Sequence, residues 1–411
     1  MKIRMRIRYW FFAIIITFSV LSCSDETSPI SEGIWLAELK VIDDESLPFN
    51  FKLTKENGAY TAEIYNASEV IQVSDVVISN DTISLFLPVF EAYLKGAFTP
   101  NTIDGIFYNE SLDRILKFKA TFGKTHRFSS DKQSNHLISG VWETRFGLNS
   151  PEEYVGKGIF VQNEDKVTGT FRTTTGDYRF LEGIVTGDSL KLSAFDGSHA
   201  YLFLAEIKDT LLEGFFYSGN HYKEPFLAKR NEVFELPDED ALTFLKEGYE
   251  GFDFSFPNEK GSIISFADQQ FKGKPVVVQI MGSWCPNCLD ESKFLAEFYK
   301  QNRALDIAIV GLAFEHAKTE EKAFSSIKKL KDKVGIEYPI LLAQYGSVDK
   351  QKAQEKLPML NHVLSYPTTI FIDKQGKVRK IKTGFNGPAT GEKYLSFKRE
   401  FDAFVSMLAN E

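Results

Sequence analysis

Hydrophobic and polar residues alternate along the first half of the chain, from residue 31 to residue 230. The apolar residues recur at every second position in runs such as Phe49-Phe51-Leu53, Ile83-Leu85-Leu87 and Leu190-Leu192-Ala194. This period of two is typical of strands that bury one face. Residue pairs that suit hairpin turns fall between the runs: Asn57-Gly58, Gly176-Asp177 and Asp196-Gly197. The pattern therefore predicts an antiparallel, all-β region without long helices.

The same region contains an internal repeat. Gly33-Ile34-Trp35 recurs about 107 residues later as Gly140-Val141-Trp142, and 81–85 recurs as 188–192 at the same offset. Each copy is long enough for six to eight short strands, so we predict two small barrels or sandwiches, at 31–124 and 139–230. The Gly-x-Trp opening resembles that of lipocalin-like barrels. Such barrels either hold an apolar ligand or peptide or bury their aromatic residues as core, and both interpretations stay open.

Strands and helices alternate in the second half, over 251–411. The predicted strands are 276–281, 307–314, 338–342, 368–372 and 378–383, and the predicted helices are 285–302, 320–334, 350–363 and a last one that ends at 408. Thr319 is the expected N-cap of the second helix. The acidic segment 231–250 is interpreted as a linker with a short helix over 241–246. The whole chain is thus predicted to be multidomain, with the duplicated β region followed by an α/β domain.

The N-terminus has the pattern of an export signal. Basic residues at positions 2, 4, 6 and 8 precede an apolar segment, 9–21, that is too short to span a bilayer. Val20-Leu21-Ser22-Cys23 resembles a bacterial lipoprotein signal, which implies that 1–22 is removed and that Cys23 carries the lipid. An uncleaved signal anchor and ordinary secretion with Cys23 as a spare thiol are the alternatives. Each of them exports the protein, so we expect it in the cell envelope, facing the periplasm or the cell surface.

The charge of the chain argues against one class of function, which is nucleic-acid binding. The net charge is -8 and the isoelectric point is about 5.5. Beyond the N-terminal signal no basic run offers a surface for nucleic acid, so nucleic-acid binding is not expected.

The strongest chemical signal is Trp284-Cys285-Pro286-Asn287-Cys288, directly after the buried strand 276–281. A cysteine at a helix N-terminus has a stabilised thiolate, so Cys285 is the predicted nucleophile. Cys288 lies one helical turn further and is the predicted resolving thiol. Half of a zinc site is the alternative interpretation. Zinc would need further ligands, yet the only other cysteine is Cys23 and the six histidines form no H-x-x-x-H pair, so we predict no metal and no cofactor.

Residues 251–411 resemble the thioredoxin superfamily, and within it the exported TlpA/ResA-like thiol-disulfide oxidoreductases. The resemblance rests on the Trp284 to Cys288 motif, on Glu291 three places later, and on Ser365-Tyr366-Pro367-Thr368 before an apolar strand. The latter matches the cis-proline loop of the family. The resemblance implies that Pro367 faces the dithiol while the backbone near Tyr366 pairs with a substrate strand. A proline that merely begins a strand is the alternative.

The chain departs from thioredoxin at Gln279. There, six residues before the first cysteine, the family places a buried acid that helps to move the proton of the resolving thiol, and glutamine does not titrate. Glu315, at the end of strand 307–314, is the candidate replacement for this proton transfer. A solvated acid at a strand end is the other interpretation of Glu315.

These observations predict a lipid-anchored thiol-disulfide oxidoreductase that acts as a reductase. A membrane electron donor would reduce Cys285-Cys288, which would reduce disulfides in exported proteins; oxidant or isomerase activity stays open. A thiol peroxidase is one alternative, but it needs a hydroxyl residue three places before the reactive cysteine, where this chain has Gly282. A β-region lipoprotein that binds a ligand or partner and carries a redox module is the other.

Overall fold

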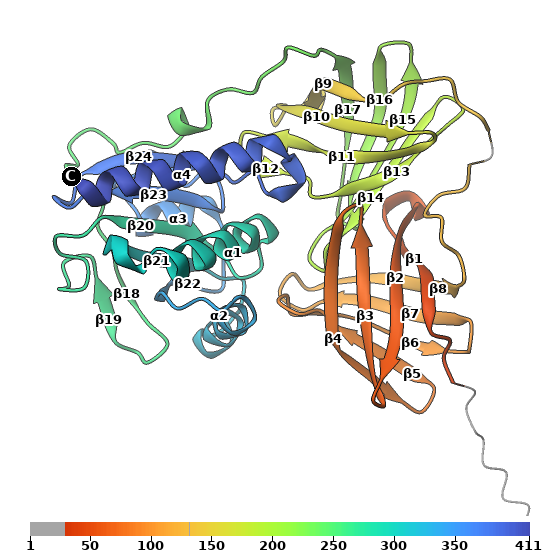
Figure 1. The fold of residues 1–411 in the computed structure, drawn as a ribbon, viewed down its shortest axis with the longest axis horizontal. Helices are drawn as coiled ribbons and strands as arrows, with labels where there is room; N and C mark the ends of the chain where they lie inside the picture. Colours follow the sequence, from red (N-terminus) through yellow and green to blue (C-terminus); the bar gives the residue numbers. More distant parts are fainter. Residues whose placement is uncertain (1–28, 131) are drawn as a thin grey trace, which may run out of the picture.

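The computed structural model describes residues 29–130 and 132–411. Figure 1 shows three parts: two strand-rich units that lie against each other and a helical unit that lies beside both. The predicted signal at 1–22 and the predicted lipidation site Cys23 lie outside the described residues. Within the described residues, no helix has both the length and the apolar composition needed to cross a membrane.

The first strand-rich unit is a closed barrel in which each strand pairs with the next and β8 pairs back to β1. Its strands are β1 (Gly33–Lys40), β2 (Ser46–Glu56), β3 (Ala59–Asn66), β4 (Glu69–Ser79), β5 (Thr82–Phe86), β6 (Ala92–Phe98), β7 (Thr102–Asn109) and β8 (Arg114–Phe122). Trp35 is fully buried, stacks on Phe51, and donates its indole N–H to Ser31 O at 3.1 Å. The repeated tryptophan therefore belongs to the core of the first barrel.

The second unit closes in the same way, through the pairing of β10 with β11. Its strands are β9 (Gly140–Phe146), β10 (Tyr154–Asn163), β11 (Lys166–Thr173), β12 (Gly176–Asp177), β13 (Leu181–Thr186), β14 (Ser189–Phe195), β15 (Ala200–Lys208), β16 (Leu211–Ser218) and β17 (Tyr222–Arg230). Trp142 is 1% exposed and donates to Ile138 O at 2.8 Å, as Trp35 does to Ser31. Phe146, Phe171 and Phe203 are buried and contact one another inside the barrel. The prediction of two antiparallel barrels or sandwiches is confirmed as two barrels, and aromatic side chains form the second core.

The C-terminal unit is a five-stranded sheet with helices on its faces, as predicted for a thioredoxin-like domain (Figure 1). The sheet order is β22-β21-β20-β23-β24, with β20 at the centre, parallel to β21 and antiparallel to β23. The elements are β18 (Ser255–Pro257), β19 (Ile263–Ser265), β20 (Val276–Met281), α1 (Pro286–Gln301), β21 (Ala308–Phe314), α2 (Glu320–Val334), β22 (Ile340–Gln344), α3 (Lys350–Lys356), β23 (Thr368–Ile372), β24 (Val378–Thr383) and α4 (Glu392–Asn410). Thr319 caps α2 by accepting from Lys322 N, as predicted.

Two predicted helices are wrong in extent. The helix predicted over 350–363 is present only as α3, because Pro358 disfavours helical backbone at the residue before it and cannot donate an N–H. The helix predicted over 241–246 is absent, and only a 3₁₀ turn forms, at Glu239–Ala241, capped by Asp238. Glu239 instead pairs with Lys382, which ties the predicted linker to the C-terminal sheet.

Both barrels contact the C-terminal unit, but in different ways. The first barrel contacts α2: Lys329 Nζ donates to Phe90 O at 2.8 Å and Ser326 Oγ donates to Glu91 Oε1 at 2.8 Å. The second barrel reaches the C-terminal unit with the hairpin formed by β11 and β12, which Figure 1 shows beside the start of α4. The hairpin lies beside the cysteine motif described next.

Candidate active site

The central strand leads directly into the cysteine motif. All six residues of β20 are buried, and the chain then turns through Gly282 and Ser283 to Cys285, the N-cap of α1. A Cβ at Gly282 would collide with the indole of Trp284, so this tight turn requires glycine. Pro286 occupies the first position of α1, where its missing N–H costs no helical hydrogen bond. A buried strand followed by a sharply started helix thus positions the two cysteines.

Cys285 and Cys288 form a disulfide, with their Cα atoms 5.2 Å apart. Cys285 Sγ also accepts the N–H of Cys288 at 3.1 Å, which places it at the positive end of α1. The exposed fraction is 6% for Cys285 and 0% for Cys288. The helix terminus stabilises a thiolate at Cys285 when the pair is reduced, and Cys288 is sheltered behind it.

The predicted proline loop lies against the disulfide. The peptide bond between Tyr366 and Pro367 is cis, both residues are buried, and Tyr366 O is 3.4 Å from Cys285 Sγ. The ring of Tyr366 packs edge-on against Trp284 at 5.8 Å between centroids. Gly384 N, just after β24, donates to Pro367 O at 2.9 Å. The structure therefore brings residues 366–367 to the dithiol, although they are about 80 positions away.

Gln279 is fully buried in β20, and its amide lies below the dithiol. Its Nε2 donates to Glu291 Oε2 at 2.9 Å and lies 3.4 Å from Cys288 O. Thr369 Oγ1 donates to the other carboxyl oxygen of Glu291 at 2.6 Å. Burial raises the pKa of Glu291 to about 7. Glu291 is therefore a titratable group on the Cys288 side of the site.

The sequence interpretation used Glu291 only as part of a motif and gave it no chemistry. Its spacing from Cys288 indicates that it lies near the dithiol, because Glu291 follows Cys288 by three positions and such residues share a helix face. Whether that face pointed to Gln279 depended on the packing of α1 on β20.

Glu315 is 2% exposed, so its interpretation as a solvated strand-end acid is wrong. Its carboxylate accepts the backbone N–H of Ser283 at 2.8 Å and the Ser283 hydroxyl at 2.7 Å. Burial raises the pKa of Glu315 to about 7. These contacts place Glu315 against Ser283, in the turn that leads from β20 to Cys285.

The second barrel contributes polar groups that the sequence did not indicate. Ser365 Oγ donates to Thr175 O at 3.1 Å, Gly387 N donates to Asp177 Oδ2 at 2.6 Å, and Ser198 Oγ donates to Trp284 O at 3.1 Å. Asn287 Nδ2, inside the cysteine motif, is 3.5 Å from Asp177 O. Residues from both sides of the predicted linker therefore meet next to the disulfide.

A thioredoxin-like fold with a buried-strand, two-cysteine, helix geometry and a cis-proline beside it defines the class, which is the thiol-disulfide oxidoreductases. Comparison with known proteins agrees with this class. Residues 248–381 match the profile of the AhpC/TSA family.

Curated relatives cover about a third of this chain. The chain is similar to the thioredoxin-like protein YneN of Bacillus subtilis, with 29% identity over 140 residues, which are 34% of this chain and 73% of that protein. It is also similar to the thiol-disulfide oxidoreductase ResA of the same organism, with 27% identity over 142 residues, 34% of this chain and 69% of that protein. Among solved structures it resembles a thiol:disulfide interchange protein of the thioredoxin family from Chlorobium tepidum, with 21% identity, a TM-score of 0.30, and coverage of 40% of this chain and 98% of that one.

Proposed function

We propose that this protein reduces disulfides in exported proteins with the Cys285–Cys288 dithiol. The observation that carries the proposal is the disulfide itself, at the N-terminus of α1 and 3.4 Å from the proline loop. The similarity to ResA, whose name describes a thiol-disulfide oxidoreductase, supports the reaction class. The lipoprotein-like signal that ends at Cys23 supports attachment to the cell envelope by a lipid, facing the periplasm or the cell surface.

The reaction proceeds in two exchanges. The Cys285 thiolate attacks one sulfur of the substrate disulfide, which forms a mixed disulfide and releases the other substrate sulfur as a thiol. The Cys288 thiolate then attacks Cys285 Sγ, which closes the Cys285–Cys288 disulfide and releases the second substrate thiol. Two electrons and two protons pass to the substrate, and a membrane electron donor returns the electrons.

The buried acids supply a place for the proton of Cys288. Glu291 lies on the Cys288 side through Gln279, and Glu315 lies on the Cys285 side through Ser283. A carboxyl with a pKa of about 7 exchanges a proton near neutral pH, which an ordinary glutamate does not. We therefore assign the acid–base role to this pair, with Glu291, one helical turn after Cys288, as the residue that serves the resolving thiol.

The test is the reduction potential of Cys285–Cys288, measured by equilibration with glutathione or dithiothreitol buffers. A potential of about -270 mV or lower agrees with a reductase, and one near roughly -120 mV reverses the direction to an oxidant. Cys288→Ser is the matched control, since one thiol gives no intramolecular couple. The absence of any reversible couple in the native protein would refute the oxidoreductase proposal.

The two alternatives make different demands. A peroxidase needs a hydroxyl group three places before Cys285, but Gly282 stands there and Trp284 fills the space that a side chain would take. A peroxide-consumption assay tests this alternative directly. A ligand-binding role for the barrels needs an open interior, whereas the second barrel buries a contiguous aromatic core.

A further inference from the structure

The hairpin of β11 and β12 covers the face of the redox unit through which a disulfide would approach Cys285. Its tip contacts the proline loop through Ser365, the cysteine motif through Asn287, and the loop after β24 through a bridge between Gly176 and Phe385. Ser198, on the neighbouring turn of the same barrel, bonds the backbone of Trp284. Three segments around Cys285, which are the proline loop, the cysteine motif and the loop after β24, are therefore in contact with the second barrel.

This cover conflicts with thiol exchange in the closed arrangement. A sulfur of the substrate must reach Cys285 Sγ, and exchange rates depend on that access. Cys285 is the N-cap of its helix, only 6% of the residue is exposed, and the hairpin tip is bonded to Ser365 and Asn287 beside it. The hairpin tip therefore stands beside Cys285, where a protein substrate would have to bring its sulfur.

The contacts of the tip are polar, while its base is firmly held. Thr175 accepts one hydrogen bond from Ser365, and Asp177 accepts from Gly387 N and from the amide of Asn287. At the base, Tyr178 packs into the aromatic core of the barrel, and Arg179 forms buried ion pairs with Glu69, Asp196 and Asp290. Weakly held loops open locally at much lower free energy than cores do. The base therefore acts as a hinge for a tip that can lift.

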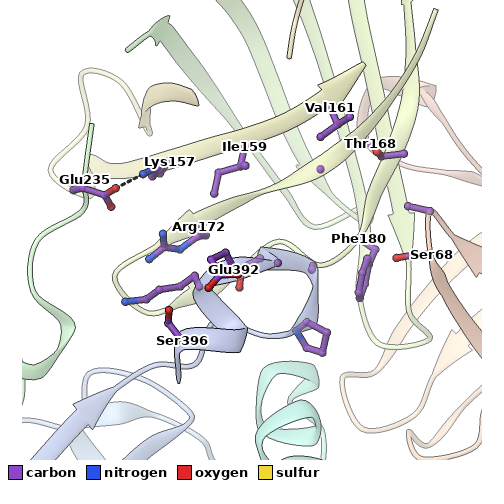
Figure 2. A pocket seen from close by; sticks show the side chains of 17 residues that line it. Ser68, Lys157, Ile159, Val161, Thr168, Arg172, Phe180, Glu235, Glu392 and Ser396 are labelled. Carbon is purple, nitrogen blue, oxygen red and sulfur yellow. Dashed lines mark hydrogen bonds and ion pairs between the residues drawn. The ribbon is translucent and has the colours of Figure 1, made fainter. Parts of the chain in front are cut away.

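The interface is also incomplete beside the hairpin. Figure 2 shows a cavity between β10, β11 and the start of α4, into which Arg172 extends. Its volume is about 640 Å³. Arg172 contacts the redox unit through its Nε, 3.0 Å from Asn386 Oδ1. A polar interface with a cavity separates more readily than a packed apolar one.

We propose that the hairpin tip, Thr174 to Asp177, occupies the substrate-binding site of the redox unit. The substrate is an extended polypeptide segment that carries a disulfide, and it reaches Cys285 only when the tip moves away. The proposal goes beyond the proposed function and rests on Cys285 as its reactive thiol. The partner surface is the rim of Ser365, Asn287 and the Phe385 backbone. Gly176 forms a parallel β-bridge with Phe385. The partner that fits this surface is therefore an extended chain with a small residue opposite Phe385.

Gly384→Ala tests the proposal from the redox side. A Cβ at Gly384 would lie 2.5 Å from the backbone of Thr175, so it forces the tip away. Gly376→Ala is the matched control: Gly376 lies just before β24 as Gly384 lies just after it, its φ is similarly positive, 83° against 75°, and its Cβ would meet only Phe266, at 3.7 Å. Ser365→Ala is the second variant, which removes one hydrogen bond to the tip without changing the backbone.

The measurement is the rate at which Cys285 of the reduced, full chain reacts with a polymer-tagged maleimide, divided by its rate with iodoacetamide and followed by peptide mass spectrometry. The ratio isolates access from thiol reactivity. A minor open state of about 0.1–10% predicts that Gly384→Ala raises the ratio by about tenfold or more. Ser365→Ala should raise it roughly fivefold, the effect of one hydrogen bond on an equilibrium.

An unchanged ratio in folded Gly384→Ala and Ser365→Ala would overturn the proposal, as would an equal rise in Gly376→Ala, which would indicate general loosening. The ratio reports access to Cys285 alone, so the access proposal can be refuted while the redox couple of Cys285 and Cys288 is intact. A missing redox couple would instead contradict the proposed function and leave the access result readable.

Discussion

The two barrels are copies in outline but differ at one corresponding turn. In the first barrel, β3 and β4 join through a tight turn, where Asn66 pairs with Glu69. In the second barrel, the equivalent strand is broken: β12 pairs with β11 for only two residues, and the chain leaves the sheet until β13 begins at Leu181. The repeat keeps its offset of about 107 residues across this point. The second barrel therefore has a broken strand at this point, without an insertion, and the turn beside it reaches the redox site.

The same turns also meet each other. At the repeat offset, Arg179 of the second barrel corresponds to Gln72 of the first, and Gly176 corresponds to Glu69. Arg179 pairs with Glu69, with Asp196 of its own barrel, and with Asp290 on α1. One guanidinium therefore links all three parts of the molecule, while Gln72 is exposed and bonds only within its barrel, to Glu63.

The strongest test of this difference exchanges the two corresponding residues. Arg179→Gln leaves three buried or half-buried carboxylates without their shared cation, so it should lower the free energy of unfolding by about 3–5 kcal/mol. The reciprocal change, Gln72→Arg, lies on the surface and should stay within about 0.5 kcal/mol. Urea unfolding followed by circular dichroism measures both. Equal effects of the two changes on the free energy of unfolding would contradict this structural difference between the turns.

The pH dependence of the free energy of unfolding reports on the buried acids of the redox unit. Burial raises the pKa of Glu291 to about 7 from an ordinary 4.5, so the folded protein binds its proton more tightly than the unfolded chain does. The free energy of unfolding should therefore fall as pH rises from about 4.5 to 7, by on the order of 3 kcal/mol for this group. Glu291→Gln should remove that part of the slope. If the slope persists in Glu291→Gln but vanishes in Glu315→Gln, the effect belongs to Glu315, whose pKa is raised to a similar value.

The second barrel supplies neither of the two acids that we assign to proton transfer, because Glu291 and Glu315 both belong to the redox unit. Glu291→Gln should slow disulfide reduction by about 10²-fold and remove the rise in rate near pH 7, since the ionised carboxylate accepts the proton of Cys288. Glu315→Gln should have a smaller effect, because Glu315 acts through Ser283. Rates of insulin reduction across pH values measure both. A larger loss in Glu315→Gln would exchange the two assignments.

The smallest effect is expected at the contact of the first barrel. Ser326→Ala removes the hydrogen bond from α2 to Glu91 and should cost about 1 kcal/mol of stability. It should leave the maleimide-to-iodoacetamide ratio at Cys285 unchanged, in contrast to Ser365→Ala. A change in that ratio would indicate that the first barrel also controls access to the site.

Local patterns in the sequence were sufficient for the architecture. Period-two alternation and the repeated Gly-x-Trp predicted two β units. A strand that buries one face has an apolar residue at every second position, and each barrel has its core tryptophan at the same place. The cysteine motif after an apolar run predicted a helix N-terminus, and Cys285 is the N-cap of α1. The helix predicted over 350–363 ends at Lys356, because Pro358 disfavours helical backbone at Leu357 and donates no N–H.

By itself, then, the sequence determined the dithiol, the proline beside it and the kind of fold around them, since each depends on neighbouring residues or on a short periodicity. Only the tertiary structure decided which acids are buried near the dithiol and which segment lies beside Cys285. Glu291 acquires its raised pKa from burial between β20, β23 and α1, and the hairpin meets Ser365 across 190 positions of chain. Burial and contacts between distant segments have no local pattern, because they arise only when separate units pack together.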